Sequence, residues 1–138
     1  MPQALTRLTQ STRGQGFYDM TGPVARWVAE QNPAVGLLTA FCRHTSASLV
    51  IQENADPTVR EDLSTFLGDL APADGRYVHA DEGPDDMPAH IRTMVTATSL
   101  TIPVERGRML LGTWQGLYLA EHRSRPHRRE IVLHLLAE

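Results

Sequence analysis

Lysine is absent from this chain of 138 residues, and cysteine occurs only once. All 13 basic residues are arginine, which excludes Schiff-base chemistry and a lysine general base. The single Cys42 cannot form a disulfide within the chain, nor can it define a cysteine-based metal framework. Because Cys42 lies in the apolar run 37–42, we expect a buried thiol rather than a nucleophile.

Long apolar runs and concentrated charge are also missing. No stretch is long enough to span a bilayer, and the N-terminal residues lack the apolar segment of a signal peptide. The net charge is −3 and no run of basic residues forms an obvious face for nucleic-acid phosphates, so we predict neither a nucleic-acid nor a membrane partner. With 41% hydrophobic and 21% charged residues, the chain is predicted to be a cytoplasmic globular protein with one domain, residues 1–138.

Hydrophobic periodicity predicts an α+β fold. Three segments repeat apolar residues at helical spacing, each with a proline near its start, whereas the remaining apolar segments have the alternation or the short length of strands. We therefore expect a mixed, mostly antiparallel sheet packed with two or three helices. The predicted helices are 21–32, 56–71 and 88–98, and the predicted strands are 4–10, 16–20, 35–42, 47–52, 77–78, 100–104, 108–113, 117–121 and 131–136.

The segment from His79 to His90 has the most unusual composition in the chain. Its twelve residues include two histidines and four carboxylates, and adjacent anions repel one another unless they face water, cations or a metal ion. A helix can begin at Pro88, which would place His90 in the first turn, pointing back towards the acidic loop. Imidazoles and carboxylates that converge in this way suit a divalent cation. The alternative is a solvated acidic loop.

A third metal ligand has to come from elsewhere, and His44 is the best donor. It precedes Thr45, Ser46 and Ser48 at the predicted junction of two strands. Hydroxyls and free backbone N–H groups in such a turn suit phosphate oxygens. Alternatively, these hydroxyls only satisfy local backbone groups.

Two glycines, Gly112 and Gly116, bracket Trp114 and Gln115 within an apolar hairpin. This pattern predicts a bulge or a close approach of backbone. Trp114 could then stack on a flat heterocycle while Gln115 contacts its edge. The alternative is a tryptophan in the core.

Glu121 ends an apolar segment just before an arginine-rich loop. It could act as a general base or a ligand, or it could form an ion pair with Arg123 or Arg129. Arg128 and Arg129 could bind a diphosphate through paired hydrogen bonds. They could equally belong to a solvated turn.

Taken together, these segments resemble the YjbQ family, which is named for a secondary thiamine-phosphate synthase activity. The likeness runs in order from about Gly14 to the C-terminus, and it departs from the family most clearly in the loop 124–127. The segments that carry it are His44-Thr45-Ser46-Ala47-Ser48-Leu49, Glu53-Asn54, Asp56-Pro57-Thr58-Val59-Arg60, Glu82-Gly83, Asp85-Asp86-Met87-Pro88-Ala89-His90, Gly107-Arg108, Gly112-Thr113-Trp114-Gln115-Gly116 and Glu121-His122-Arg123.

The resemblance implies a small α+β subunit that forms a homotrimer, with its site in a cleft near the subunit boundaries. It also implies an enzyme that joins hydroxymethylpyrimidine diphosphate to thiazole phosphate and releases pyrophosphate. Two other functions remain open: metal-dependent hydrolysis of a small phosphorylated molecule, and a non-catalytic trimer that binds a metal or a metabolite.

Each candidate residue receives an expected role at this stage. His44, His79 and His90 are the expected ligands of a divalent metal, zinc or magnesium. Proton transfer is expected from Asp86 or Glu121, with His44 as a further catalytic residue. The expected contacts to a small phosphorylated substrate are Thr45, Ser46, Ser48, Asn54, Trp114, Gln115 and Arg129.

Overall fold

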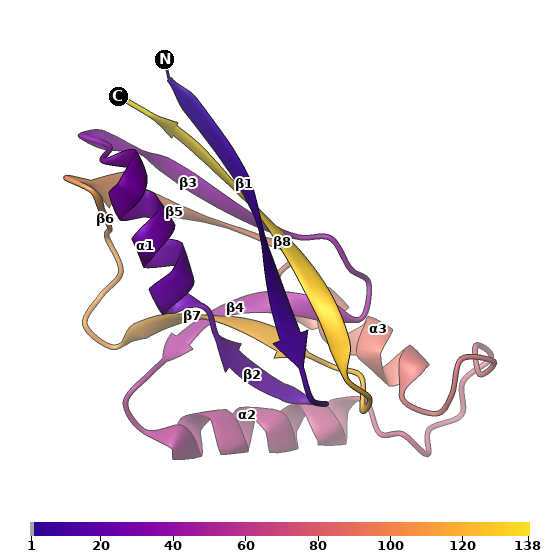
Figure 1. Cartoon of the computed structure of the whole chain (residues 1–138). Helices are drawn as coiled ribbons and strands as arrows, with labels where there is room; N and C mark the ends of the chain where they lie inside the picture. Colours follow the sequence, from indigo (N-terminus) through magenta and orange to yellow (C-terminus); the bar gives the residue numbers. More distant parts are fainter. Residues whose placement is uncertain (1) are drawn as a thin grey trace.

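The computed structural model describes residues 2–138 and has two antiparallel sheets and three helices (Figure 1). The α+β class predicted from the sequence is confirmed. The elements are β1 (Gln3–Thr12), β2 (Gly16–Asp19), α1 (Thr21–Gln31), β3 (Val35–Cys42), β4 (Ala47–Glu53), α2 (Pro57–Leu70), α3 (Asp86–Val95), β5 (Ser99–Glu105), β6 (Arg108–Met109), β7 (Gln115–Glu121) and β8 (His127–Ala137).

The strands divide between a sheet of five, in the order β1-β8-β3-β5-β6, and a sheet of three, in the order β2-β7-β4. Every paired strand in both sheets is antiparallel. The termini lie close together, since β1 and β8 pair along their full length from Gln3↔Leu136 to Thr12↔His127 (Figure 1). The sequence predicted one mixed sheet, whereas the structure has two separate sheets.

The core fills the space between the two sheets and α1. Alternation along β3 turns Leu38, Ala40 and Cys42 into this space, as expected for a half-buried strand. Leu49 and Leu119 meet them from the small sheet. Cys42 is 1% exposed, and burial raises the pKa of its thiol to about 11, so the predicted buried thiol is confirmed.

The opposite face of the five-stranded sheet, which we call the outer face, exposes large apolar side chains. Val35, Leu37 and Phe41 of β3 point to this side at 58%, 43% and 45% exposure. Leu136 of β8 lies opposite Leu37, and Leu5 of β1 lies one strand further out. Neither a helix nor a second sheet of the described chain covers these side chains (Figure 1).

The main differences from the sequence prediction concern two strands and the start of one helix, and the helix start matters for the site. The strand predicted at 77–78 is wrong, because these residues form an irregular loop, and the strand predicted at 108–113 is reduced to Arg108–Met109. Helix α3 begins at Asp86, two residues before the predicted Pro88. Proline is tolerated there because the first N–H groups of a helix have no partner within it.

Within residues 2–138, no helix is both long enough and apolar enough to cross a membrane. Helix α2 carries the predicted apolar stripe, but none of its residues is buried. Instead, it covers the small sheet from below and leaves a shallow apolar groove of about 660 Å³ between α2, β4 and the end of α3.

Candidate metal centre

Two histidines and one aspartate converge at the start of α3. His79 Nε2 lies 2.6 Å from Asp86 Oδ2, and His90 Nε2 lies 3.2 Å from the same oxygen. One ligand atom from each of the three residues lies within 4.8 Å of the others. Asp86 and His90 meet because they are four residues apart on one helix, so their side chains share a face, while His79 comes from the preceding loop.

Backbone contacts fix the orientation of His90. Its Nδ1 lies 3.0 Å from the carbonyl oxygen of Thr45, and only a protonated Nδ1 can donate to that acceptor. In a neutral ring the lone pair is then on Nε2, which faces the Asp86 carboxylate. Two acceptors that face each other repel unless a cation, either a proton or a metal ion, lies between them.

Arg123 holds the Asp86 carboxylate from the other side. Its Nη1 donates to Asp86 Oδ1 at 2.8 Å, and its Nε donates to Asp85 Oδ2 at 2.9 Å. Burial would raise the pKa of Asp86. A hydrogen bond from His79 and the charges of His90 and Arg123 outweigh it, and they hold the pKa below its ordinary value. Asp86 is therefore a carboxylate with one oxygen anchored and the other directed at the two imidazoles.

This donor set fits zinc better than magnesium. Two imidazole nitrogens and one carboxylate oxygen match the three-ligand sets of catalytic zinc sites, which leave a further position open. Magnesium prefers oxygen ligands in octahedral geometry. His90 is hydrogen-bonded to Thr45, and Asp86 to Arg123. Metal ligands are commonly oriented by hydrogen bonds of this kind to residues that do not themselves contact the metal.

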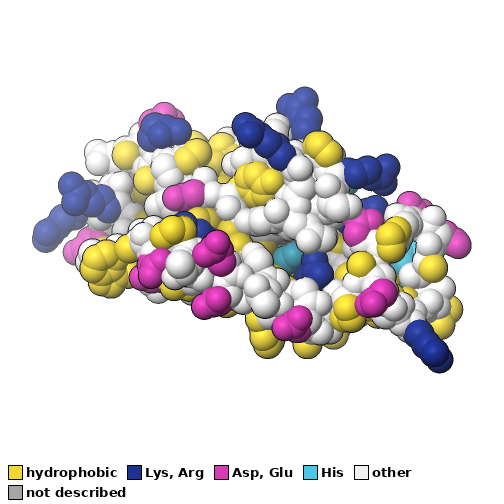
Figure 2. All heavy atoms as spheres, turned by 90° about the horizontal axis from the view of Figure 1, so that it is seen from below, with side chains coloured by type: hydrophobic (Ala, Val, Ile, Leu, Met, Phe, Trp, Pro, Cys, Tyr) yellow, Lys and Arg dark blue, Asp and Glu magenta, His cyan; other side chains and the backbone are white. Residues whose placement is uncertain are grey.

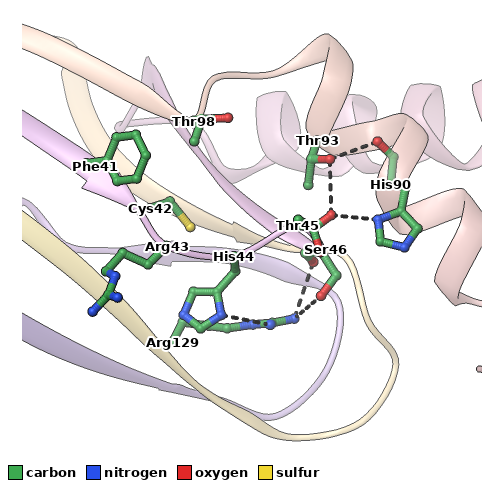
Figure 3. A pocket seen from close by; sticks show the side chains of 10 residues that line it. All are labelled: Phe41, Cys42, Arg43, His44, Thr45, Ser46, His90, Thr93, Thr98 and Arg129. Atoms are coloured by element: carbon green, nitrogen blue, oxygen red, sulfur yellow. Dashed lines mark hydrogen bonds between the residues drawn. The ribbon is translucent and has the colours of Figure 1, made fainter.

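An open pocket of about 770 Å³ adjoins the cluster and has His90 in its wall (Figure 3). Thr45 and Thr93 border it beside His90, and the Thr93 hydroxyl donates to the carbonyl groups of His90 and Thr45. Arg43 lines the opposite side, where its guanidinium contacts Glu130 at 3.0 Å and stays half exposed. Hydroxyls and an accessible guanidinium are groups that bind phosphate oxygens.

The structure does not bring His44 into the metal cluster, so the prediction that three imidazoles meet at one point is wrong within a subunit. The backbone N–H of Glu130 donates to His44 Nε2 at 2.7 Å, so this lone pair is already used. His44 Nδ1 lies 3.5 Å from the guanidinium of Arg129, whose positive charge opposes metal binding (Figure 3). Burial and Arg129 also lower the pKa of His44. Asp86 takes the place of the third ligand, and His44 has no free basic nitrogen for catalysis.

Glu121 and Arg129 are partners of one another, which contradicts the roles predicted for them. Arg129 Nε and Nη2 donate to the two carboxylate oxygens of Glu121. Thr12 and the backbone N–H groups of His122 and Arg123 also donate to Glu121. Burial alone would raise the pKa of Glu121. These hydrogen bonds outweigh burial, so the pKa lies below its ordinary value. A fully buried and fully bonded carboxylate is not a general base, and the paired Arg129 is not an open phosphate ligand.

Of the serines, Ser46 and Ser48 are both buried. Ser46 Oγ accepts from Arg129 Nη2 at 2.9 Å at the edge of the pocket. Ser48 instead hydrogen-bonds to His122 Nε2 at 2.9 Å inside the fold, so it faces away from the pocket.

Asn54, Trp114 and Gln115 lie at the far end of the small sheet. Register pairs Gln115 with Glu53 at one end of β7 and Glu121 with Ala47 at the other. Six residue steps separate these ends, about 20 Å of extended strand. Trp114 is 62% exposed there, and Gln115 Oε1 accepts from the N–H of Gly112. One subunit therefore does not combine these residues with the histidine cluster.

Sequence reasoning missed Arg43, Thr93 and Arg123 at this site. Nothing in the local sequence marks Arg43 or Thr93, because their role depends on the packing of α3 against the turn after β3. The four-residue spacing of Asp86 and His90 was a usable signal, but it required the helix to begin at Asp86.

Comparison with known proteins gives a consistent result over nearly the whole chain. Residues 6–138 match the family model described as UPF0047 protein YjbQ-like. The UPF0047 protein sll1880 of Synechocystis is 51% identical over 132 residues, which cover 95% of this chain and 90% of that protein. The UPF0047 protein YjbQ of Escherichia coli O157:H7 is 43% identical, with 95% of this chain and 96% of that protein covered.

Solved structures agree with the fold. An uncharacterised yjbq/upf0047 family protein from Clostridium acetobutylicum superposes with a TM-score of 0.87 at 32% identity, covering 95% of this chain and 99% of that chain. A protein of unknown function from Sulfolobus solfataricus gives a TM-score of 0.88 over 99% and 100% of the two chains, but its 21% identity supports the fold alone.

Proposed function

This chain belongs to the YjbQ-like UPF0047 family, and we propose that it is a metal-dependent enzyme that acts on a small phosphorylated molecule. The reaction takes place in the pocket between α3 and the turn after β3. His79, Asp86 and His90 hold a divalent cation, for which zinc is the best candidate.

One observation carries this proposal. The Nδ1–H of His90 is committed to the Thr45 carbonyl, and Asp86 Oδ1 is committed to Arg123. The remaining electron pairs, on His90 Nε2 and Asp86 Oδ2, face each other and His79 Nε2. Such a convergence is costly in a site that holds nothing positive, and a cation at its centre removes the cost.

The walls of the pocket supply what a phosphorylated substrate needs. Thr45 lies next to His90 with an exposed side chain, and Arg43 presents an accessible guanidinium at the opposite side. The Thr93 hydroxyl donates to backbone carbonyls and so supports the wall between them. A divalent cation, when bound, would polarise a phosphoryl oxygen and neutralise developing negative charge. We therefore assign phosphate contact to Arg43 in place of the buried Arg129.

Hydrolysis of a phosphate ester is the reaction we favour. The residues expected to stack on and read a flat heterocycle, Trp114 and Gln115, lie at the other end of β7. The second candidate is the condensation of hydroxymethylpyrimidine diphosphate with thiazole phosphate, with release of pyrophosphate. The volume of about 770 Å³ supports this candidate, because it exceeds what one phosphate group requires.

We also propose that the subunits assemble as a homotrimer through the outer face. Soluble monomers rarely expose a contiguous apolar patch of this kind, and Leu37, Phe41 and Leu136 are each at least 37% exposed on it. Phe41 also lines the pocket. Assembly through this face would place the pocket beside a subunit boundary.

The test combines metal analysis with an activity screen. Purified protein is expected to contain close to one zinc ion per subunit, and chelator-treated protein is expected to regain zinc on titration. Hydrolysis of a panel of phosphomonoesters and phosphodiesters, and condensation of the pyrimidine and thiazole phosphates, are then measured with and without zinc.

Three variants decide the outcome. Asp86→Asn and His90→Ala are expected to lose both zinc and activity, whereas His127→Ala, a matched histidine outside the cluster, is expected to keep both. If the His90→Ala variant and the chelator-treated protein keep their activity, the proposal is wrong. Zinc binding without turnover of any substrate in the panel would replace it with a non-catalytic binding function.

A further inference from the structure

A second cavity, of about 220 Å³, lies near the lower side of the small sheet, between β2, α2, α3 and the end of β7. Its lining includes Gln15, Ser64, Arg92 and His122. The space-filling view from below shows a hollow in which a histidine and a basic side chain are visible (Figure 2). Apart from Glu121, no residue given a role above lines this cavity.

The cavity is separate from the metal pocket because α3 lies between them. Arg92 follows His90 by two residues, and successive side chains on a helix are about 100° apart. The two side chains therefore point to opposite faces of α3, about 200° apart around its axis. His90 lines the larger pocket and Arg92 lines the smaller one.

Arg92 is a buried cation without a counter-ion. Its exposure is 7%, and its Nη2 donates to the carbonyl of Ala71 at 3.0 Å. Its Nε is fully buried and has no hydrogen-bond partner among residues 2–138. The ion pairs formed within this described part of the chain do not include Arg92. Burial also lowers the pKa of this guanidinium.

Among residues 2–138, no neighbouring carboxylate forms an ion pair with this guanidinium. The charge of Asp85 favours it, but the Asp85 carboxylate is bonded to Arg123. His122 is 2% exposed, and burial together with the charge of Arg92 lowers the pKa of its imidazole to about 4, so it is neutral at pH 7. Glu121 also borders the cavity, but Arg129 neutralises its carboxylate. An arginine that is removed from water in this way is unfavourable unless an anion pairs with it.

We propose that this cavity binds a small oxyanion, such as a phosphate or carboxylate group, through the guanidinium of Arg92. Polar side chains suited to the remaining oxygens are present in the same walls. Ser64 contributes a hydroxyl from α2, and Gln15 contributes an amide that is held by its hydrogen bond to the carbonyl of His122 at 3.2 Å. Guanidinium groups are well matched to oxyanions because their N–H donors form a planar fork.

The wild-type protein gives a direct test, because the Nε–H of a buried arginine can be followed by NMR. Chelator-treated protein is titrated with inorganic phosphate, with acetate and with chloride at constant ionic strength. Phosphate or acetate is expected to shift the Arg92 Nε–H signal until the site is saturated. The anion that binds with the higher affinity shows whether the cavity prefers a phosphate or a carboxylate group. Chloride is expected to leave the signal unchanged.

Calorimetry with phosphate uses protein that carries Arg43→Met, so that the larger pocket lacks its guanidinium. In this background Arg92→Met is expected to weaken phosphate binding at least tenfold, while Arg26→Met, a matched change at an exposed position on α1, is expected to leave it unchanged. An Arg92 signal that responds to neither oxyanion overturns the inference, as does undiminished binding by Arg92→Met. Because the metal has been removed, these results are independent of whether the proposed enzyme function holds.

Discussion

Glu121 and Arg129 form a two-point ion pair in the interior of the fold. Arg129 Nε donates to Oε1 at 2.7 Å and Nη2 donates to Oε2, with side-chain exposures of 0% for Glu121 and 5% for Arg129. The pair joins the end of β7 to the start of β8 and so connects the two sheets. Two residues that look like an acid and a phosphate ligand in the sequence therefore have a structural role.

Replacing Glu121 with Gln is expected to destabilise the protein by about 3–5 kcal/mol, because it leaves the buried guanidinium of Arg129 without its counter-charge. Urea denaturation at neutral pH measures this loss. Glu130→Gln, which breaks a partly exposed ion pair with Arg43, is the control and is expected to cost less than about 1 kcal/mol. Equal losses in the two variants would contradict the structural role of Glu121.

Arg123→Met is expected to lower zinc affinity about 10–100-fold, since contacts that orient a ligand typically contribute this much. The guanidinium holds Asp86 Oδ1, and its removal leaves that carboxylate free to rotate away from the histidines. Titration of chelator-treated protein with zinc measures the change. Arg125→Met, an exposed position in the same loop, should retain the wild-type affinity. The orienting role is rejected if both variants bind zinc alike.

The buried imidazole of His122 predicts a loss of stability in mild acid. Its pKa is about 4 in the folded protein, mainly because of burial, against an ordinary value of 6.5. Between these values the unfolded chain binds a proton that the folded chain excludes, so stability is highest above pH 6.5 and falls as the pH drops towards 4. The difference corresponds to about 3 kcal/mol.

His122→Gln is expected to flatten that part of the pH profile, whereas His134→Gln, on the outer face, should keep it. Unfolding free energies measured in urea at pH 7, 6, 5 and 4.5 give the two slopes. If the wild type and His122→Gln lose stability in parallel over this range, another group is responsible.

Leu37→Glu is expected to dissociate the proposed homotrimer, because it places a charge at the centre of the apolar outer face, opposite Leu136. Light scattering coupled to size exclusion measures the mass. Val78→Glu is the control, since Val78 is fully exposed in the loop before α3 and away from this face. A wild-type chain that elutes as a monomer at micromolar concentration would contradict the assembly.

Several features of the fold were predictable because they depend on neighbouring residues. Apolar alternation located β1, short apolar runs located β3 and β4, and proline near a helix start located all three helices. The candidate metal centre was only half predictable. The acidic surroundings of His79 and His90 predicted these two as ligands, whereas Asp86 was predicted to transfer a proton and the helix was predicted to begin two residues too late.

The sequence alone determined the class of fold, the burial of Cys42 and the cluster of ligating groups before and within α3, because each follows from local pattern and composition. Tertiary structure alone decided which distant groups meet. The pairing of β7 with β4 places Gln115 beside Glu53 and Glu121 beside Ala47, and the hydrogen bond from Glu130 to His44 keeps that histidine out of the cluster of His79, Asp86 and His90. Glu130 and His44 are 86 residues apart in the chain, and no local pattern predicts a contact between residues so distant in sequence.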